Sequence, residues 1–281
     1  MTSHTAGGIA YDRADRSGEG LPLVLLHAGV ADRRMWDPVW SRLGAQRAMV
    51  RLDLRGFGES TRRPLGPLSP VDDVLDTLAE LDIERCHVVG ASFGAGVAVE
   101  AALTRPDAVA SLLLSAPGGS LIAETTPDLL AFVDAERSAL ERGDLDAAVE
   151  ANLTWWVDGP TRPPGGVDPE VRELVRSMQR RAFELTADWD DVDERELDPP
   201  ALDRLSEVRV PTLVLLGALD LQAIQVAARR VTDEVAGARR VDWPDVAHLP
   251  SMERPDAFVA LLREWLEELE GGPRDRPRNQ P

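Results

Sequence analysis

Five short runs of apolar residues, each bounded by turn-forming residues, recur along this chain of 281 residues. The runs occupy residues 21–29, 48–54, 86–92, 110–117 and 212–220, and a weaker sixth run occupies 238–243. They are almost continuously apolar and rich in Val and Leu, which is typical of strands whose sheet is covered on both faces. The runs therefore predict a buried, mostly parallel β-sheet.

Helical patterns separate most of these runs. They cover residues 33–43, 70–81, 94–103, 221–235 and 255–269, and Ser69 is placed to cap the second of them. Strands that alternate with helices indicate an α/β fold, because each helix returns the chain across the sheet so that the next strand runs parallel. We therefore predict a mostly parallel sheet with helices on both faces.

The alternation stops between residues 121 and 205, where no convincing strand occurs. This stretch contains three amphipathic helical patterns, at 127–142, 144–156 and 168–185, joined by turns rich in Pro and Gly. An inserted helical block of this kind predicts a lid over the sheet. We expect a core of residues 1–120 and 206–270, a helical lid of residues 121–205, and a disordered tail of residues 271–281.

The charge balance restricts the partners of this protein. Lys and Arg number 31 against 49 Asp and Glu, which gives a net charge of −18. Nucleic acid and anionic membranes both require a positive surface, so neither is an expected partner. The single cysteine, Cys86, excludes an intrachain disulfide and a cysteine-cluster metal site. The start of the chain lacks a signal-peptide pattern and no run is long enough for a membrane span, so we expect a cytoplasmic protein.

The motif Gly-Ala-Ser-Phe-Gly at residues 90–94 follows the third apolar run and precedes a helix of small residues. A serine at such a strand-to-helix turn needs small residues two positions away on either side, because the turn is very tight. Its hydroxyl then projects from the carboxyl edge of the sheet, and the backbone N–H of Phe93 points toward a substrate oxyanion. The alternative interpretation is a glycine-rich helix start in which Ser92 is only a cap.

A nucleophilic serine needs a general base and an acid that orients the base. Among the four histidines, His248 is the candidate base, because it follows the last strand at the sheet edge that carries Ser92; a surface loop histidine is the alternative. Asp220 is the candidate acid, because it follows the strand at 212–217 and lies between serine and histidine in chain order. Asp242 and Glu124 are competitors, the first within the last strand and the second at the start of the inserted block.

The turn after the first apolar run is the expected source of a second oxyanion donor. Small residues there let the backbone approach a substrate oxygen, and the N–H of Gly29 is the first candidate, with Val30 the second. We expect His27 to brace this turn through hydrogen bonds and to take no chemical part. The loop at 53–60, with its two glycines, is expected to be structural as well.

Three tryptophans are candidates for substrate contact. Trp36 follows the oxyanion turn and is expected either to line an acyl pocket or to pack the first helix. Trp155 and Trp156 lie in the inserted block, and adjacent residues of a helix point to different sides, so at most one of them should face the pocket. Packing inside the lid is the alternative for both.

The segments LLHAGVADRRMWDPV, DLRGFGES, GASFGAG, PTLVLLGALD and AHLPSMERP resemble the α/β-hydrolase superfamily over residues 8–269. Within the superfamily, the chain resembles the small lid-bearing serine esterases and the 3-oxoadipate enol-lactonase-like group. This resemblance implies an α/β-hydrolase sheet in which Ser92, Asp220 and His248 form a catalytic triad. It also implies that Gly29 and Phe93 form the oxyanion hole.

The sequence departs from the superfamily's pattern at two positions. Ala28 stands where a glycine usually follows the histidine, which bears on the choice of amide donor, and Ala247 replaces the glycine before the catalytic histidine. At the nucleophile position the chain has Ser92 and not aspartate. That difference speaks against haloalkane dehalogenases and epoxide hydrolases, which the chain otherwise resembles.

We therefore expect a serine hydrolase that cleaves a small-molecule carboxylic ester or lactone through an acyl-enzyme, with no metal and no organic cofactor. One alternative uses the same triad on the C–C bond of a β-diketone or ring-cleavage product, and another is cofactor-free perhydrolysis. A protein of a different class, one that binds a ligand in this fold without turnover, is the remaining alternative. The oligomeric state stays open.

Overall fold

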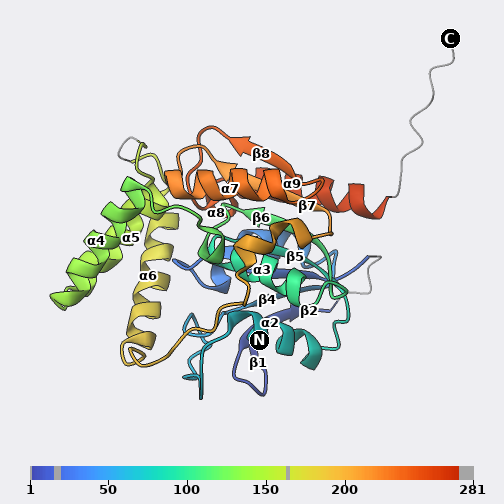
Figure 1. Ribbon diagram of the computed structural model, residues 1–281, viewed down its shortest axis with the longest axis horizontal. Helices are drawn as coiled ribbons and strands as arrows, with labels where there is room; N and C mark the ends of the chain where they lie inside the picture. The colour runs from blue at the N-terminus through green and yellow to red at the C-terminus, as the bar shows by residue number, and fades with distance from the viewer. Residues whose placement is uncertain (1, 16–19, 163–164, 272–281) are drawn as a thin grey trace, which may run out of the picture.

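The computed structural model describes residues 2–15, 20–162 and 165–271 (Figure 1). Its sheet has eight strands in the order β1-β2-β4-β3-β5-β6-β7-β8. The strands are β1 (Ser3–His4), β2 (Ala10–Ala14), β3 (Leu23–Leu26), β4 (Met49–Leu52), β5 (Cys86–Ala91), β6 (Val109–Ser115), β7 (Thr212–Gly217) and β8 (Arg239–Trp243). From β4 to β8 all neighbours pair in parallel, and β1 and β2 are antiparallel additions at one side. The predicted α/β fold with a mostly parallel sheet is confirmed.

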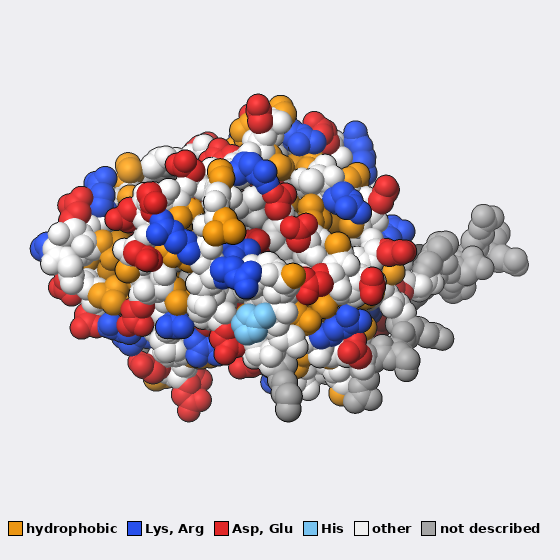
Figure 2. Space-filling model, turned by 90° about the horizontal axis from the view of Figure 1, so that it is seen from below, with side chains coloured by type: hydrophobic (Ala, Val, Ile, Leu, Met, Phe, Trp, Pro, Cys, Tyr) orange, Lys and Arg blue, Asp and Glu red, His pale blue; other side chains and the backbone are white. Residues whose placement is uncertain are grey.

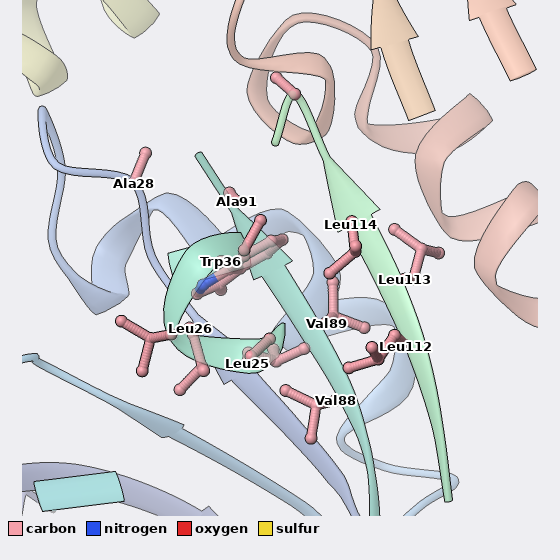
Figure 3. Packing of buried hydrophobic residues seen from close by; sticks show 14 of the residues in the cluster. Leu25, Leu26, Ala28, Trp36, Val88, Val89, Ala91, Leu112, Leu113 and Leu114 are labelled. Atoms are coloured by element: carbon pink, nitrogen blue, oxygen red, sulfur yellow. The ribbon is translucent and has the colours of Figure 1, made fainter. Parts of the chain in front are cut away.

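The central strands β3, β5, β6 and β7 are buried along their whole length. Successive side chains of a strand point to opposite faces, so complete burial means that both faces are covered. Leu25 and Leu26 of β3 lie beside Val88 and Val89 of β5, which in turn lie beside the leucines of β6 (Figure 3). These contacts form the core that fixes the strand register.

Helices cover the sheet, as the alternation of patterns predicts. They are α1 (Asp37–Leu43), α2 (Pro70–Glu80), α3 (Phe93–Thr104), α7 (Gln222–Glu234), α8 (Pro250–Glu253) and α9 (Pro255–Glu270). Helix α1 contacts α9, and α2 contacts α3. Ser69 caps α2 by accepting a hydrogen bond from the backbone N–H of Asp72.

Three local features differ from the sequence-based expectation. The polar strand β2, AYDRA, was not predicted, because it is an edge addition that buries little and pairs antiparallel with β4. The short strand β1, which contains His4, was not predicted either. The helix expected at 33–43 begins as the 3₁₀ turn η1 (Arg33–Trp36), and α1 starts beyond it, with Pro38 in its first turn.

The segment between β6 and β7 is mostly helical. Its elements are η2 (Gly119–Leu121), α4 (Pro127–Glu141), α5 (Leu145–Asn152), η3 (Leu153–Asp158), α6 (Pro169–Thr186) and η4 (Ala201–Glu207). Helices α4, α5 and α6 lie together at one end of the sheet (Figure 1), whereas η2 and η4 contact α3. We call residues 121–205 the inserted block. The helix expected at 144–156 is wrong in its last turn, since η3 is a π-helix. Apolar spacing cannot separate the two, because a π-turn adds only about one residue.

The predicted disordered tail, residues 271–281, lies outside the described residues except for Gly271. No helix among the described residues combines the length and apolar character that a membrane crossing requires. On the face shown in Figure 2, acidic and basic side chains are interspersed, so the negative charge does not gather in one patch there.

Candidate active site

Ser92 occupies a strained turn between β5 and α3. Its backbone has φ 50° and ψ −113°, a combination that residues with a side chain rarely adopt. A Cβ on Gly90 would overlap the backbone of Gly94, and a Cβ on Gly94 would lie 2.6 Å from the carbonyl oxygen of His27. The two glycines of the motif are therefore required by backbone packing, and they allow the Ser92 side chain to stand at the carboxyl edge of the sheet.

His248 joins Ser92 to Asp220. Its Nε2 lies 2.7 Å from Ser92 Oγ, and its Nδ1 lies 2.7 Å from Asp220 Oδ2. The other Asp220 oxygen, Oδ1, accepts a 2.8 Å hydrogen bond from the backbone N–H of Leu221. The side chains of His248 and Asp220 are 2% and 0% exposed, so water does not compete for these bonds. The three residues named from the sequence thus meet in a continuous hydrogen-bonded chain.

The loops that carry Asp220 and His248 are tied to each other. The N–H of Ala218 donates to the carbonyl of Trp243, and the N–H of Leu219 donates to that of Val246. Gly217 permits this contact, because a Cβ there would overlap the carbonyl oxygens of Val246 and Ala247. The sequence motif GALD therefore needs its glycine for the close approach of the histidine loop.

The two competing acids lie elsewhere. Asp242 is exposed on β8, and its carboxylate accepts hydrogen bonds of 2.8 and 2.7 Å from Arg240. Glu124 is exposed at the start of the inserted block. Among the described residues only Asp220 places a carboxylate against the His248 ring.

The turn after β3 lies directly against the Ser92 turn. The N–H of Gly94 donates to the carbonyl of His27 at 3.1 Å, and a Cβ on Gly29 would lie 3.6 Å from the Phe93 side chain. Within the described parts of the chain, the backbone N–H groups of Gly29 and Phe93 donate no hydrogen bond to the protein. The residues that carry the two predicted oxyanion donors therefore lie side by side. Val30, the second candidate, is buried beside them.

His27 holds the turn in place. Its Nδ1 lies 2.9 Å from the carbonyl oxygen of Ala28, and its Nε2 accepts a 2.9 Å hydrogen bond from the N–H of Leu54. Complete burial lowers the pKa of His27, and acceptance at Nε2 requires the neutral ring. Asp53, at the start of the adjacent loop, accepts hydrogen bonds from the backbone N–H groups of Arg33 and Glu59, at 2.8 Å each. Both residues shape the site without reaching it.

The three candidate tryptophans have different surroundings. The Trp156 ring lies 4.6 Å from the His248 ring, centroid to centroid, and also contacts Phe132. Trp155 points elsewhere and lines a cavity of about 660 Å³ within the inserted block, whose described lining includes none of Ser92, Asp220 and His248. Trp36 is fully buried and packs against Phe258, which favours its packing alternative.

A buried ion pair near His248 was not predicted. Glu253 accepts a 3.0 Å hydrogen bond from the N–H of Ala247 and a 3.3 Å bond from that of Leu249, the residues on either side of His248. Its other oxygen pairs with Arg162 of the inserted block, and both side chains are 6% exposed. Burial raises the pKa of Glu253. The glutamate five residues after the histidine was visible in the sequence, but its partner, 91 positions away, was not.

A second cavity, of about 440 Å³, lies beside Gly29 and Phe93, and we call it the Gly29–Phe93 cavity. Phe57 and Trp189 provide aromatic walls, and Leu68 adds an aliphatic wall. Its volume is in the usual range for pockets that hold small molecules. No cluster of three or more His, Cys, Asp and Glu side chains suited to a metal ion occurs in the described parts of the chain.

A mostly parallel sheet, a strained serine between strand and helix, and a histidine and aspartate after the last two strands define the class of α/β-hydrolase-fold proteins. The model of the alpha/beta hydrolase family matches residues 23–261. The chain belongs to this family, which confirms the resemblance stated from the sequence.

Several known proteins are similar along nearly the whole chain. A pimeloyl-[acyl-carrier protein] methyl ester esterase of Aeromonas salmonicida is 25% identical over 254 residues, which are 89% of this chain and 96% of that protein. A strigolactone esterase of Pisum sativum is 26% identical over 261 residues, covering 89% and 94%. The crystal structure of the enol-lactonase from Burkholderia xenovorans superposes with a TM-score of 0.70 at 23% identity, covering 95% of this chain and all of that one.

Proposed function

We propose that this protein hydrolyses a small-molecule carboxylic ester or lactone, with Ser92 as nucleophile, His248 as general base and Asp220 as the acid that orients the base. The observation that carries the proposal is the hydrogen-bonded chain in which His248 joins Ser92 Oγ at 2.7 Å and Asp220 Oδ2 at 2.7 Å. This order of groups is what activation of a serine requires. The similarity to methyl ester and strigolactone esterases supports an ester as the bond cleaved.

Acylation follows from the geometry. Ser92 Oγ attacks the carbonyl carbon while its proton passes to Nε2 of His248. Nδ1–H of His248 donates to Asp220, so the carboxylate stabilises the imidazolium that forms. The substrate oxygen becomes an oxyanion and accepts hydrogen bonds from the N–H groups of Gly29 and Phe93. The imidazolium then protonates the alcohol oxygen, the carbon–oxygen bond breaks, and an acyl-Ser92 ester remains.

Deacylation reverses the roles. His248 takes a proton from water, the hydroxide attacks the acyl carbon, and the proton returns to Ser92 Oγ as the acid leaves. In a lactone the leaving alcohol stays joined to the acyl group, so the product is one hydroxy acid. No step needs a metal ion or an organic cofactor.

The experiment that tests the proposal measures hydrolysis of a chromogenic short-chain ester by the parent protein, by Ser92→Ala and by Ser41→Ala. Ser41 is exposed on α1 and serves as the matched control. We expect Ser92→Ala to lose at least ~10³ in kcat while remaining folded, and Ser41→Ala to keep parent activity. Near-parent turnover by Ser92→Ala would exclude Ser92 as the nucleophile.

A further inference from the structure

The Gly29–Phe93 cavity is lined by the two residues whose amides are the proposed oxyanion donors. A substrate whose carbonyl oxygen binds these amides has its acyl and alcohol groups next to the cavity. Its walls near the donors are the rings of Phe57, Phe93 and Trp189. An ion that leaves water for such walls loses hydration, and this loss must be offset by a partner of opposite charge. The charges available in the cavity therefore decide which substrate groups it admits.

The cationic residue in the described lining is Arg55, and its guanidinium is already paired with protein groups. Its Nε donates to Asp73 at 2.8 Å, a second nitrogen pairs with the other Asp73 oxygen, and the guanidinium also donates to the carbonyls of Gly7 and Arg62. The Arg55 and Asp73 side chains are 9% and 16% exposed, so their pairing is shielded from water. Arg55 thus brings no free positive charge to the cavity.

Among the arginines of the adjoining segments, Arg62 donates to the carbonyl of Ala6, and two others are in ion pairs. Arg63 pairs with Asp191, and Arg195 pairs with Asp72.

Two further members of the lining, Asp190 and Glu194, are exposed carboxylates at the rim of the cavity. An anion that approaches the rim is repelled by these two carboxylates.

We propose that the Gly29–Phe93 cavity selects the charge of the substrate: it accepts an uncharged or cationic group on apolar and aromatic walls and excludes a carboxylate, through Asp190 and Glu194 at its rim. This inference rests on the proposed function and deepens it. The substrates are then neutral or cationic esters and lactones, and a lactone that bears a free carboxylate is a poor substrate.

The test compares nitrophenyl esters whose acyl chains have equal length and end in a methyl, a carboxylate or a trimethylammonium group. A second series carries the same three groups on the alcohol side, because either side could occupy the cavity. In at least one series we expect kcat/KM for the carboxylate ester to be roughly tenfold or more below the other two, with the gap narrowing as salt is added. Equal values for methyl and carboxylate esters in both series would overturn the inference.

Variants of the two rim carboxylates test whether they cause the discrimination against the carboxylate ester. Asp190→Asn/Glu194→Gln should raise the ratio of kcat/KM for the carboxylate ester to kcat/KM for the methyl ester by roughly fivefold. The matched control is Asp107→Asn/Asp233→Asn, which removes the same net charge from two exposed positions near the amino edge of the sheet. An equal gain in this kcat/KM ratio in both double variants would overturn the inference. It would mean that the net charge of the protein, and not the charge at the cavity, sets the preference.

Binding separates this inference from the proposed function. Trp189 lines the cavity, so the part of the tryptophan fluorescence that Trp189→Phe removes reports occupancy in Ser92→Ala protein without turnover. We expect the methyl and ammonium esters to bind more tightly than the carboxylate ester even if the parent hydrolyses none of them. Loss of hydrolysis with retained charge preference would refute the proposed function alone, and Ser92-dependent hydrolysis without charge preference would refute the inference alone.

Discussion

The carboxyl edge of the sheet and the inserted block are held in place by different interactions. At the sheet edge, the Ser92 turn packs on the backbone of His27, and the Asp220 loop packs on the backbone of the His248 loop. Gly94 and Gly217 leave no room for a side chain at these contacts. In the inserted block, ion pairs such as those of Arg172 with Asp158 and Glu150 join the helices. The edge is thus positioned by backbone packing and the block by side chains.

This difference has a consequence for function. Groups that make and break bonds must stay within a few tenths of an ångström, which close backbone contact ensures. Groups that recognise a substrate must differ between relatives, and side-chain contacts are replaced more easily. The two regions meet where Arg162 of the block pairs with Glu253, next to His248.

The largest effect is expected at the sheet edge, from Asp220→Asn. The amide can present N–H to Nδ1 of His248, which favours the wrong ring tautomer, and in serine proteases the equivalent change costs ~10⁴ in kcat. Asp242→Asn and Glu124→Gln are the controls, and each should change kcat by less than about twofold. Comparable losses in a control and in Asp220→Asn, measured on one ester, would contradict the assignment of the acid.

The next largest effect is expected where the inserted block meets the sheet edge, at the ion pair of Arg162 with Glu253. Arg162→Met should lower the free energy of unfolding by ~3 kcal/mol, because it leaves the Glu253 carboxylate buried without its partner. The control is Arg172→Met, whose ion pairs are partly exposed and worth about 1 kcal/mol or less. Urea titrations give both values, and the double variant Arg162→Met/Glu253→Gln should recover part of the loss. An Arg162→Met loss no larger than that of Arg172→Met would mean that the pair does not join the two regions.

Acid should lower the free energy of unfolding through His27, which is buried at the sheet edge. Burial lowers the pKa of His27 in the folded protein, so below pH ~6.5 the unfolded chain binds a proton that the folded one resists. The stability from His27 is therefore present above that pH and is lost below it, at up to ~1.4 kcal/mol per pH unit. His87, whose pKa burial also lowers, acts in the same direction.

Unfolding free energies measured between pH 5 and 7 test this. His27→Gln should reduce the slope of stability against pH, and His4→Gln, at an exposed position, should leave it unchanged. Parallel slopes for the parent and His27→Gln would show that the buried ring does not govern the acid response.

The smallest effect is expected within the block. Trp156→Ala removes a ring that packs on His248 and should change the relative kcat/KM of short and long esters by roughly three- to tenfold. Trp155→Ala alters a cavity away from Ser92 and should change that ratio by less than about twofold. The same proportional loss on every ester would argue that Trp156 only supports His248.

The sequence allowed more to be predicted at the sheet edge than in the block, for physical reasons. Backbone contacts leave local marks in the sequence. These are the glycines around Ser92 and the apolar strands whose following turn carries a polar residue, as the turn after β7 carries Asp220. The strand β2, which lies between β1 and β4, carries no such mark, because its polar residues do not need burial. It was missed for that reason.

Interactions within the block join residues far apart in sequence, so local patterns do not reveal them. The partner of Glu253 and the Trp189 wall of the Gly29–Phe93 cavity both come from the inserted block. The π-helix η3 directs Trp156 toward His248, and periodicity alone predicts an ordinary helix there. These features depend on how the block packs against the sheet.

Covalent labelling tests the central claim most directly. The parent protein is treated with a serine-directed phosphonate, and the adduct is located by intact mass and peptide mapping. We predict a single adduct on Ser92 that forms at the rate at which ester hydrolysis is lost, is absent from Ser92→Ala and persists in Ser41→Ala. An adduct on another residue, or inactivation of hydrolysis without modification of Ser92, would contradict the claim that this sheet edge carries the nucleophile.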